Sequence, residues 1–593
     1  MEFLPTIRRL STSRHIVSPA ACLRLVLTLL LVLAFLSLTR PAAAQNTWNG
    51  GNGNWSTAGN WSEKTSPDGS TDITIPSGIV QGDVSFTNRN ALDIDLSAEL
   101  IVLSTTTITN SSSSAGIFNG GSLQNNGIIN GDGLTSVINY GSVTNSAGAQ
   151  MIGVSGFNNK DGSMLSNAGT MSLASLDSDG SIINSAGALL TITVELSVDN
   201  GTLLSNAGTL TTFALFNGGT VNNTAGTMQI GGSGSINYGS VNNSYGAEIT
   251  ITGATNNKDA STLNNDGILN IQNSFSQSGL LSNTSNGILN NSSSLTNYQT
   301  LTNAGTLNNP GGLSNLGSLL VLNGGTLNNT GSIGNTSGGG FVVQSGGTFN
   351  NSGSFLSDYL SSFGSQANST ILNTGDMSLG GNTVAIGGSL RNNGTITMVA
   401  GPAMGDPAIQ PPAPPLLIAS TGKLSGTGTV NQGLFGFGVI NQGVMAPGDP
   451  LGTFTIIGNY QQTATGTLEI MLGGTGVGQF GQLDITGSAD LSGTLDVELF
   501  AGFDPQAGEI FEILESGGIT NLDFLSTLFP TLPDGLFLSL DREGNNLFLD
   551  VMSGSGGGST STPEPSTAVL LLSSIAIAFG GSRLRKKGPI PGT

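Results

Sequence analysis

The chain has 593 residues, of which only 9% are charged, and it contains 90 glycines, one cysteine and one histidine. Cys22 and His15 both lie in the first 44 residues, which have the character of a removable leader. Without them, the mature protein has no Ser-His-Asp or Cys-His catalytic system, no His or Cys metal site and no structural disulfide. Residues 45–562 hold seven basic and 34 acidic residues, so nucleic acid is excluded as a partner by charge repulsion.

Residues 1–44 have the parts of a Sec-type signal peptide. Arginines precede an apolar run of 14 residues (LVLTLLLVLAFLSL), and three alanines follow at positions 42–44. The run is shorter than the roughly 20 residues of a membrane span, and Pro41 ends the helix that it would form. We therefore expect export by the Sec machinery and cleavage between Ala44 and Gln45. An uncleaved membrane anchor is the alternative.

A short pattern recurs through residues 115–400: an aliphatic residue, a spacer, Asn, one or two small residues, Gly, Thr or Ser, and another aliphatic residue. LSNAGTM, LSNAGTL, LNNDGIL and LTNAGTL are examples, and successive copies lie 18 to 21 residues apart. A longer duplication repeats FNGG, NYGSV and NNKD at an offset of 98 residues, about five copies. This period, with short alternating apolar stretches, predicts an all-β, right-handed parallel β-helix (β-solenoid) with coils of about 20 residues.

The residue types agree with such coils. Aliphatic side chains would point into a narrow core, while Asn and Gly tolerate the left-handed backbone angles of the corners. Asn repeated at one position of each coil can also form a ladder of side-chain amides. A helical solenoid is disfavoured, because Gly, Asn and Thr are poor residues for helix interiors.

The segments beside the repeats differ in composition. Residues 45–114 contain Trp48, Trp55 and Trp61 and resemble the start of secreted autotransporter-like β-helix proteins, which implies a cap and the first rungs. Alternatively, the rings are exposed and stack on sugars. Residues 401–422 are Pro-rich and predict an extended loop. Residues 423–552 have 15 acidic and two basic residues with longer strand-like runs, and resemble the β-rich, cap-like closing part of autotransporter passenger domains.

The C-terminus carries three signals in a fixed order after a Gly/Ser linker at residues 553–562. The signals are a Pro-Glu-Pro motif, an apolar segment at residues 566–581 that predicts a hydrophobic helix, and a basic cluster. The residues concerned are Pro563, Glu564, Pro565, Arg583, Arg585, Lys586 and Lys587. The basic cluster would stay in the cytoplasm by the positive-inside rule, and the short apolar segment suits a transient anchor.

This tail, residues 563–593, resembles the PEP-CTERM sorting signal of Gram-negative bacteria. The resemblance implies that exosortase, a membrane-embedded protease-transpeptidase, recognises the Pro-Glu-Pro region and removes the helix. The chain would then be held at the inner membrane only until processing, and would finally lie at the cell surface or outside the cell. The resemblance also implies an association with exopolysaccharide or biofilm. An ordinary single-pass anchor is the alternative.

Secreted β-helices often cleave polysaccharides with paired carboxylates. The closest groups of acidic residues are Asp93 with Asp95, Asp177 with Asp179, and Glu509 with Glu512 and Glu515. Alternate strand residues share a face, so Asp177 and Asp179 could form a catalytic pair or a weak calcium site. However, sugar lyases of this fold also need a base near the carboxylates. Residues 115–400 contain only three bases: Lys160, Lys258 and Arg391.

We therefore expect no catalytic residue, cofactor or metal, and predict an exported structural or adhesive rod that is not an enzyme. Two alternatives stay open. One is a secreted polysaccharide-cleaving β-helix enzyme that uses Asp177, Asp179 or another carboxylate. The other is a passive carbohydrate-binding module that uses the tryptophans.

Overall fold

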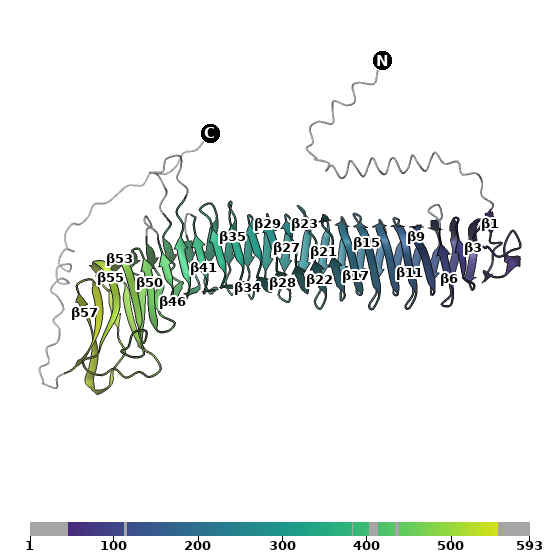
Figure 1. Cartoon of the computed structure of the whole chain (residues 1–593). Helices are drawn as coiled ribbons and strands as arrows, with labels where there is room; N and C mark the ends of the chain where they lie inside the picture. The colour runs from purple at the N-terminus through teal and green to yellow at the C-terminus, as the bar shows by residue number, and fades with distance from the viewer. Residues whose placement is uncertain (1–44, 112–115, 382–383, 402–412, 433–437, 555–593) are drawn as a thin grey trace, which may run out of the picture.

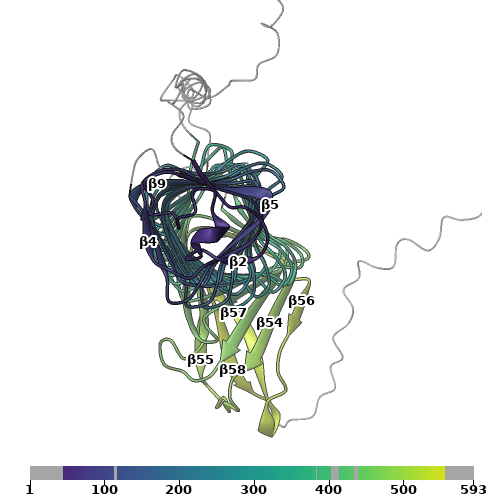
Figure 2. The same ribbon diagram turned by 90° about the vertical axis from the view of Figure 1, so that its right-hand side faces the viewer.

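The computed structural model describes residues 45–111, 116–381, 384–401, 413–432 and 438–554. The chain forms a parallel β-solenoid of about 19 turns, drawn out as a rod in Figure 1. In the end view of Figure 2 the coils lie over one another around a shared core. In the described part of the chain, helix is limited to two short 3-10 turns, Ala58–Asn60 and Pro533–Gly535. The predicted all-β solenoid is confirmed.

The first coils combine short strands with long, bent ones. The strands of this part are β1 (Gln45–Thr47), β2 (Gly53–Asn54), β3 (Asp72–Gly82), β4 (Phe86–Asn88), β5 (Leu92–Val102), β6 (Thr107–Asn110), β7 (Gly116–Asn119), β8 (Ser122–Asn125), β9 (Ile128–Asn139), β10 (Ser142–Asn145), β11 (Gln150–Asn159), β12 (Met164–Asn167), β13 (Thr170–Ser178), β14 (Ser181–Asn184), β15 (Leu189–Val198), β16 (Leu203–Asn206) and β17 (Thr209–Asn217). The long strands pair in parallel with register shifts, because an irregularity bends each of them around a corner.

From β18 (Thr220–Asn223) onward, each coil consists of three short strands. Strands β18 to β44 all have three or four residues and run from Thr220 to Met398. Each pairs in parallel with the third strand along, as β18 does with β21 (Ser240–Asn243). In a four-residue strand the second and fourth side chains are buried, and the others face outward. The second is aliphatic or aromatic, and the fourth is most often Asn.

The buried Asn residues form ladders along the rod. In the longest, the Nδ2 of each Asn donates to the Oδ1 of the next Asn, one coil further, at 2.7–2.9 Å. Its members are Asn125, Asn145, Asn167, Asn184, Asn206, Asn223, Asn243, Asn265, Asn283 and Asn303. The same Nδ2 atoms also donate to backbone carbonyls of the next coil, as Asn125 does to Gln150 at 2.8 Å. A second ladder runs from Asn291 to Asn392. The predicted amide ladders are confirmed.

The parallel ladder continues beyond residue 400. The remaining strands are β45 (Leu416–Ile418), β46 (Lys423–Gly426), β47 (Thr429–Asn431), β48 (Val439–Asn441), β49 (Val444–Pro447), β50 (Gly452–Ile457), β51 (Tyr460–Gln462), β52 (Thr467–Leu472), β53 (Gly481–Leu491), β54 (Thr494–Leu499), β55 (Ile510–Leu522), β56 (Ser526–Leu528), β57 (Leu536–Glu543) and β58 (Asn546–Ser553). Strand β45 lies inside the segment predicted as an extended loop. Its Leu-Leu-Ile triplet follows the prolines and carries the apolar side chains that a rung requires, so it pairs with β42 (Val384–Ile386) and β48.

The last strands leave the rod to one side (Figures 1 and 2). Strand β58 pairs antiparallel with both β55 and β57, whereas the coils before it pair in parallel. The predicted signal peptide, the hydrophobic helix at residues 566–581 and the sorting signal lie outside the described residues. Within the described residues, no helix has the length and apolar character needed to cross a membrane.

Candidate functional site

The three tryptophans are buried at the N-terminal end of the rod. Trp48, Trp55 and Trp61 are at most 1% exposed. Trp61 packs edge-on against the other two at 5.0 and 4.8 Å between ring centroids, and Trp55 stacks on Phe86 at 4.4 Å. The indole N–H of Trp61 donates to the Trp55 carbonyl at 2.9 Å. The hypothesis that these rings are exposed to stack on sugars is therefore wrong. Aromatic pairing gains more energy inside the core than in solvent.

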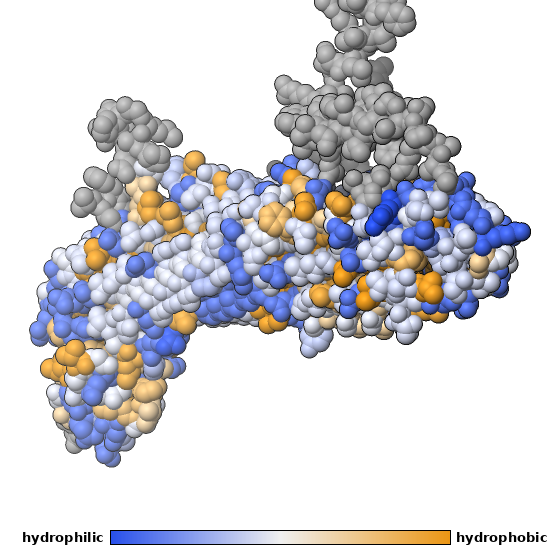
Figure 3. All heavy atoms as spheres, turned by 45° about the vertical axis from the view of Figure 1, so that its right-hand side comes forward, coloured by the Kyte–Doolittle hydropathy of each residue, from blue (hydrophilic) through white to orange (hydrophobic). Residues whose placement is uncertain are grey.

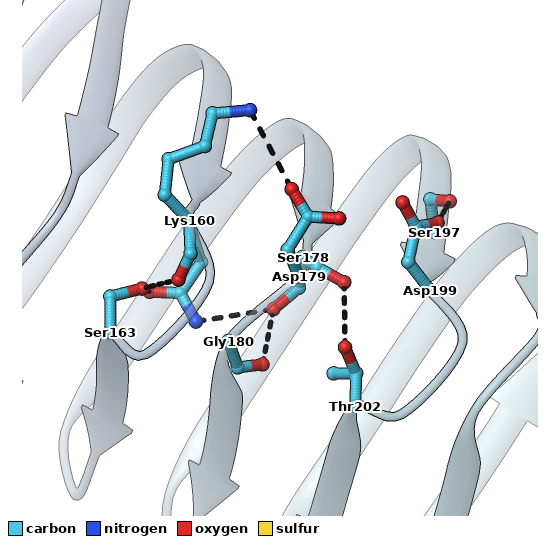
Figure 4. A network of polar contacts seen from close by, with 9 residues as sticks. Lys160, Ser163, Ser178, Asp179, Gly180, Ser197, Asp199 and Thr202 are labelled. Carbon is cyan, nitrogen blue, oxygen red and sulfur yellow. Dashed lines mark hydrogen bonds and ion pairs between the residues drawn. The ribbon is translucent and has the colours of Figure 1, made fainter.

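The carboxylates of Asp177 and Asp179 occupy different places. Asp177 points outward from β13, whereas Asp179 lies in the turn directly after that strand. The turn position aligns Asp179 with Asp199, which follows β15 in the next coil, as Figure 4 shows. The backbone N–H of Asp179 donates to Asn159, and that of Asp199 donates to Ser178, so consecutive turns stack on one another.

Asp179 has a perturbed carboxyl group. Partial burial, then the hydrogen bond and the negative charge of Asp199, raise the pKa of Asp179. The Nζ of Lys160, 3.9 Å away in the preceding turn, opposes that rise. The geometry thus pairs two surface carboxyls that can share a proton next to one ammonium group. Sequence reasoning missed Asp199, because this partner lies 20 residues away and depends on the length of one coil.

The backbone around these side chains is held by hydroxyl groups (Figure 4). Ser163 Oγ donates to the carbonyl of Lys160 and, at 2.7 Å, to Asn159 Oδ1. Ser178 Oγ donates to Gly180 at 2.7 Å, and Thr202 Oγ1 donates to Ser178 at 3.2 Å. The turns are therefore fixed relative to one another. The part of the chain that the structure describes contains no group of three or more His, Cys, Asp or Glu residues arranged to hold a metal ion.

The predicted acidic pair Asp93 and Asp95 lies at a groove in the first coils. Asp93 and Asp95 line an open groove of about 500 Å³ with Phe118, Gly120 and Tyr140.

Two of the three glutamates near the C-terminus, Glu509 and Glu512, accept hydrogen bonds from different partners. Glu512 accepts a hydrogen bond from Asn546 Nδ2 at 2.6 Å, and Glu509 accepts one from the backbone of Gln506 at 2.9 Å. Glu515 is exposed on β55. These contacts orient the carboxylates of Glu509 and Glu512 independently of each other.

Two of the few basic residues, Arg391 and Lys423, form ion pairs with acidic residues. Lys423 Nζ binds both carboxylate oxygens of Glu469 at 2.8 and 2.9 Å. Arg391 forms an ion pair with Asp449. Lys423, Asp449 and Glu469 line a groove of about 280 Å³ next to Pro450. The ladder brings these residues together across 46 and 58 sequence positions, and no local motif gave a signal for them.

The predicted processing sites are mostly beyond the described chain. Gln45 begins β1, and its Nε2 donates to Thr74 Oγ1 at 2.5 Å. Ala44 and every sorting-signal residue lie outside the described residues, so both sites stay predictions.

No family model matches the sequence, and neither does any curated protein. Among solved structures, the chain is similar to a TibA fragment that carries TibC-catalysed hyper-glycosylation. The two are 15% identical, and the match covers 74% of this chain and all of that fragment at a TM-score of 0.16. A score this low gives no support for a shared function, and the fold is established by the strand ladder itself.

Proposed function

We propose that this protein is an exported, non-enzymatic structural or adhesive rod of the cell surface or extracellular matrix. Exosortase would sort it through its PEP-CTERM tail, in association with exopolysaccharide. The observation that carries the proposal is the ladder of paired strands through the described residues, which lies between two terminal segments with the sequence of export and sorting signals. In this proposal the coils wind right-handed, strands β45 to β58, which we call the closing strands, form the C-terminal cap, and residues 566–581 form the transient membrane helix.

The architecture suits a mechanical role. About 19 turns at roughly 4.8 Å each give a rod of roughly 90 Å. Each coil contacts mainly its neighbours, so the ladders distribute an axial load over many equivalent hydrogen bonds. On the face shown in Figure 3, residues of hydrophilic and intermediate hydropathy predominate, and hydrophobic residues are scattered among them. Such a surface suits contact with a hydrated polysaccharide matrix.

Processing of the tail tests the proposal. Replacing Pro563, Glu564 and Pro565 with alanine should leave the protein in the inner-membrane fraction with the mass of the unprocessed tail. Intact-mass spectrometry of fractionated cells provides the measurement. Three serine-to-alanine changes in the linker at residues 553–562 are the matched control and should be processed normally. Identical mass and location for the alanine variant and the unaltered protein would defeat the sorting proposal.

One observation favours a second candidate, a polysaccharide-cleaving enzyme. Asp179 has a raised carboxyl pKa beside the carboxylate of Asp199 and the ammonium of Lys160, a set that could supply an acid and a charge stabiliser. Reducing-sugar release from a panel of glycans distinguishes the two candidates. We expect no release by the purified protein. Release that Asp179→Asn abolishes without unfolding the rod would establish the enzyme instead.

A further inference from the structure

The duplication of 98 residues repeats a surface pattern on one face of the rod. Phe118 and Ile138 occupy consecutive rungs at outward, half-buried positions. Phe216 and Ile236 occupy the equivalent consecutive rungs five coils later, with the same partial burial. The register between Phe118 and Phe216 is continuous, so the two copies lie on one line along the rod.

A second line follows the corner beside this face. Tyr140 is 58% exposed and Tyr238 is 54% exposed, and each occupies the turn that follows a rung of the first line. One coil earlier, the same corner position is a glycine. Gly120 precedes Tyr140 in this way, and Gly218 precedes Tyr238. The backbone N–H of Tyr140 donates to Asn119, and the backbone N–H of Tyr238 donates to Asn217, so the corners stack coil on coil.

On the corner line, each glycine lies in the coil between one that carries an aspartate and one that carries a tyrosine. A Cβ added to Gly120 would lie 3.7 Å from the carbonyl carbon of Asp95. A Cβ added to Gly218 would lie 3.7 Å from the carbonyl carbon of Asp199.

Because glycine has no side chain, the corner line has a gap in its side chains between the aspartate of one coil and the tyrosine two coils further on. We call these gaps the first notch (Asp95, Gly120, Tyr140) and the second notch (Asp199, Gly218, Tyr238). The first notch opens on the groove of about 500 Å³, which Phe118 also lines.

We propose that the two notches together bind one linear, uncharged polysaccharide that lies along the rod. A pyranose ring has an apolar C–H face that packs on an aromatic ring, and hydroxyl groups that donate to carboxylates. Each notch has a tyrosine and an aspartate, and a phenylalanine lies two residues before its glycine, so both kinds of contact are available. The proposal deepens the proposed function, on which it rests, by assigning the matrix partner a chemical class and a location.

Charge and spacing determine the kind of glycan. Asp177, Asp179, Asp199 and Asp259 outnumber Lys160 and Lys258 on the coils around the second notch, so an acidic polymer would be repelled. The notches are five coils apart, about 24 Å. A chain that reaches both gains an effective concentration for its second contact, so its avidity exceeds that of one notch by about 100-fold or more.

Affinity electrophoresis of the exported protein in native gels tests this proposal. The gels contain graded amounts of hydroxyethyl cellulose, laminarin or, as an acidic comparison, alginate. We expect retardation by a neutral polymer and none by alginate. Tyr140→Ala and Tyr238→Ala should each weaken binding about three- to tenfold by loss of stacking, and both together by about 10- to 100-fold.

Tyr298→Ala is the matched control. Tyr298 lies on the same corner line and is 51% exposed, but Ser278 replaces the glycine in the turn before it. Its loss should leave retardation unchanged, and thermal melting of every variant checks that the rod is folded.

Absence of retardation by every neutral polymer, full retardation of the double variant, or an equal loss from Tyr298→Ala would each overturn the proposal. So would a change in sedimentation that shows the notches to be a self-association surface. Tail processing is measured separately, so a failure of glycan binding leaves the sorting result intact.

Discussion

The coils of the rod and the coils of the closing strands bury different side chains in their cores. A four-residue strand of the rod buries two side chains, and one of these is usually an Asn that bonds to the neighbouring coils. The six-residue strands β50, β52 and β54 bury two or three apolar side chains each. Short strands cannot bury enough apolar surface, so amide ladders add hydrogen bonds between coils. Longer strands depend on the hydrophobic effect instead.

The amide row does not stop abruptly where the strands lengthen. Asn441 Nδ2 donates to Tyr460 Oη at 3.1 Å, and Tyr460 Oη donates to Gln462 Oε1 at 3.0 Å. Gln462 Nε2 then donates to the carbonyl of Thr494 at 2.9 Å. This mixed network replaces the uniform ladder over the last coils and marks the transition between the two kinds of core.

The largest effect is expected where the uniform ladder is broken. Asn223→Leu preserves side-chain size but removes the donor to Asn243 Oδ1 at 2.9 Å and to the carbonyl of Glu248 at 2.9 Å. It also removes the acceptor for Asn206 Nδ2. Losing these three contacts between buried groups should cost about 3 kcal/mol, although Asn206 Nδ2 keeps the carbonyls of Gly208 and Thr227 as acceptors. Hydrogen exchange of the amides in β21 and β22 (Glu248–Ile251) measures the local loss of stability.

The outward Asn row provides the control for that prediction. Asn242 Nδ2 donates to Asn222 Oδ1 at 2.8 Å on the outer side of β21, which pairs with β18 one coil further along, and water can replace this contact. Asn242→Leu should cost less than about 1 kcal/mol. Equal losses at positions 223 and 242 would mean that the buried ladder contributes no more than the exposed one.

The next largest loss of stability is expected when a side chain is added to a glycine in a closely stacked turn. A Cβ at Gly226 would overlap the carbonyl oxygen of Gly208 in the coil below, so Gly226→Ala should destabilise the rod by about 2 kcal/mol. Gly364 in β39 (Ser362–Ser365) has no atom within 4 Å of an added Cβ. Gly364→Ala should instead stabilise by about 0.5 kcal/mol through the unfolded state. Guanidinium denaturation measures the change in the free energy of unfolding for both variants. A stabilising Gly226→Ala would contradict the close stacking of this turn on Gly208.

The mixed network of the closing strands should respond less. Tyr460→Phe leaves the ring buried but removes a donor to Gln462 and an acceptor for Asn441, at a cost of about 1 kcal/mol. Burial also raises the pKa of the Tyr460 phenol.

That shift has a pH consequence. The folded chain holds this proton more tightly than the unfolded chain, so its contribution to stability is complete below the unfolded phenol pKa of about 10 and is lost at higher pH. The variant should therefore lose less stability than the unaltered protein when the pH rises above about 10. Parallel alkaline denaturation curves would contradict this reasoning.

Much of the fold could be predicted from the sequence, since one period and one 98-residue duplication fix both the coil and its register. The fate of the tryptophans could not. Aromatic residues among Asn and Gly fit a cap and a sugar platform equally well, and only tertiary packing against Phe86 decides between them. The pairing of Asp179 with Asp199 was missed for another reason. The coil length varies, so a corner partner in the next coil has no fixed spacing that a motif could reveal.

The smallest change in stability is expected for the surface carboxyl pair of Asp179 and Asp199. Because the pKa of Asp179 is raised, the folded chain favours the protonated carboxyl. The resulting stability is complete below the unfolded carboxyl pKa of about 3.9 and is lost as the pH rises through the folded value. Asp179→Asn should therefore change little near pH 3 and stabilise by a few tenths of a kcal/mol at pH 7, since solvent screens the pair. Thermal melts at both pH values, with Asp376→Asn as control, measure it. A loss of stability at pH 7 would show that attraction to Lys160 outweighs repulsion from Asp199, and the corner would then resemble the paired Lys423 and Glu469 of the closing strands.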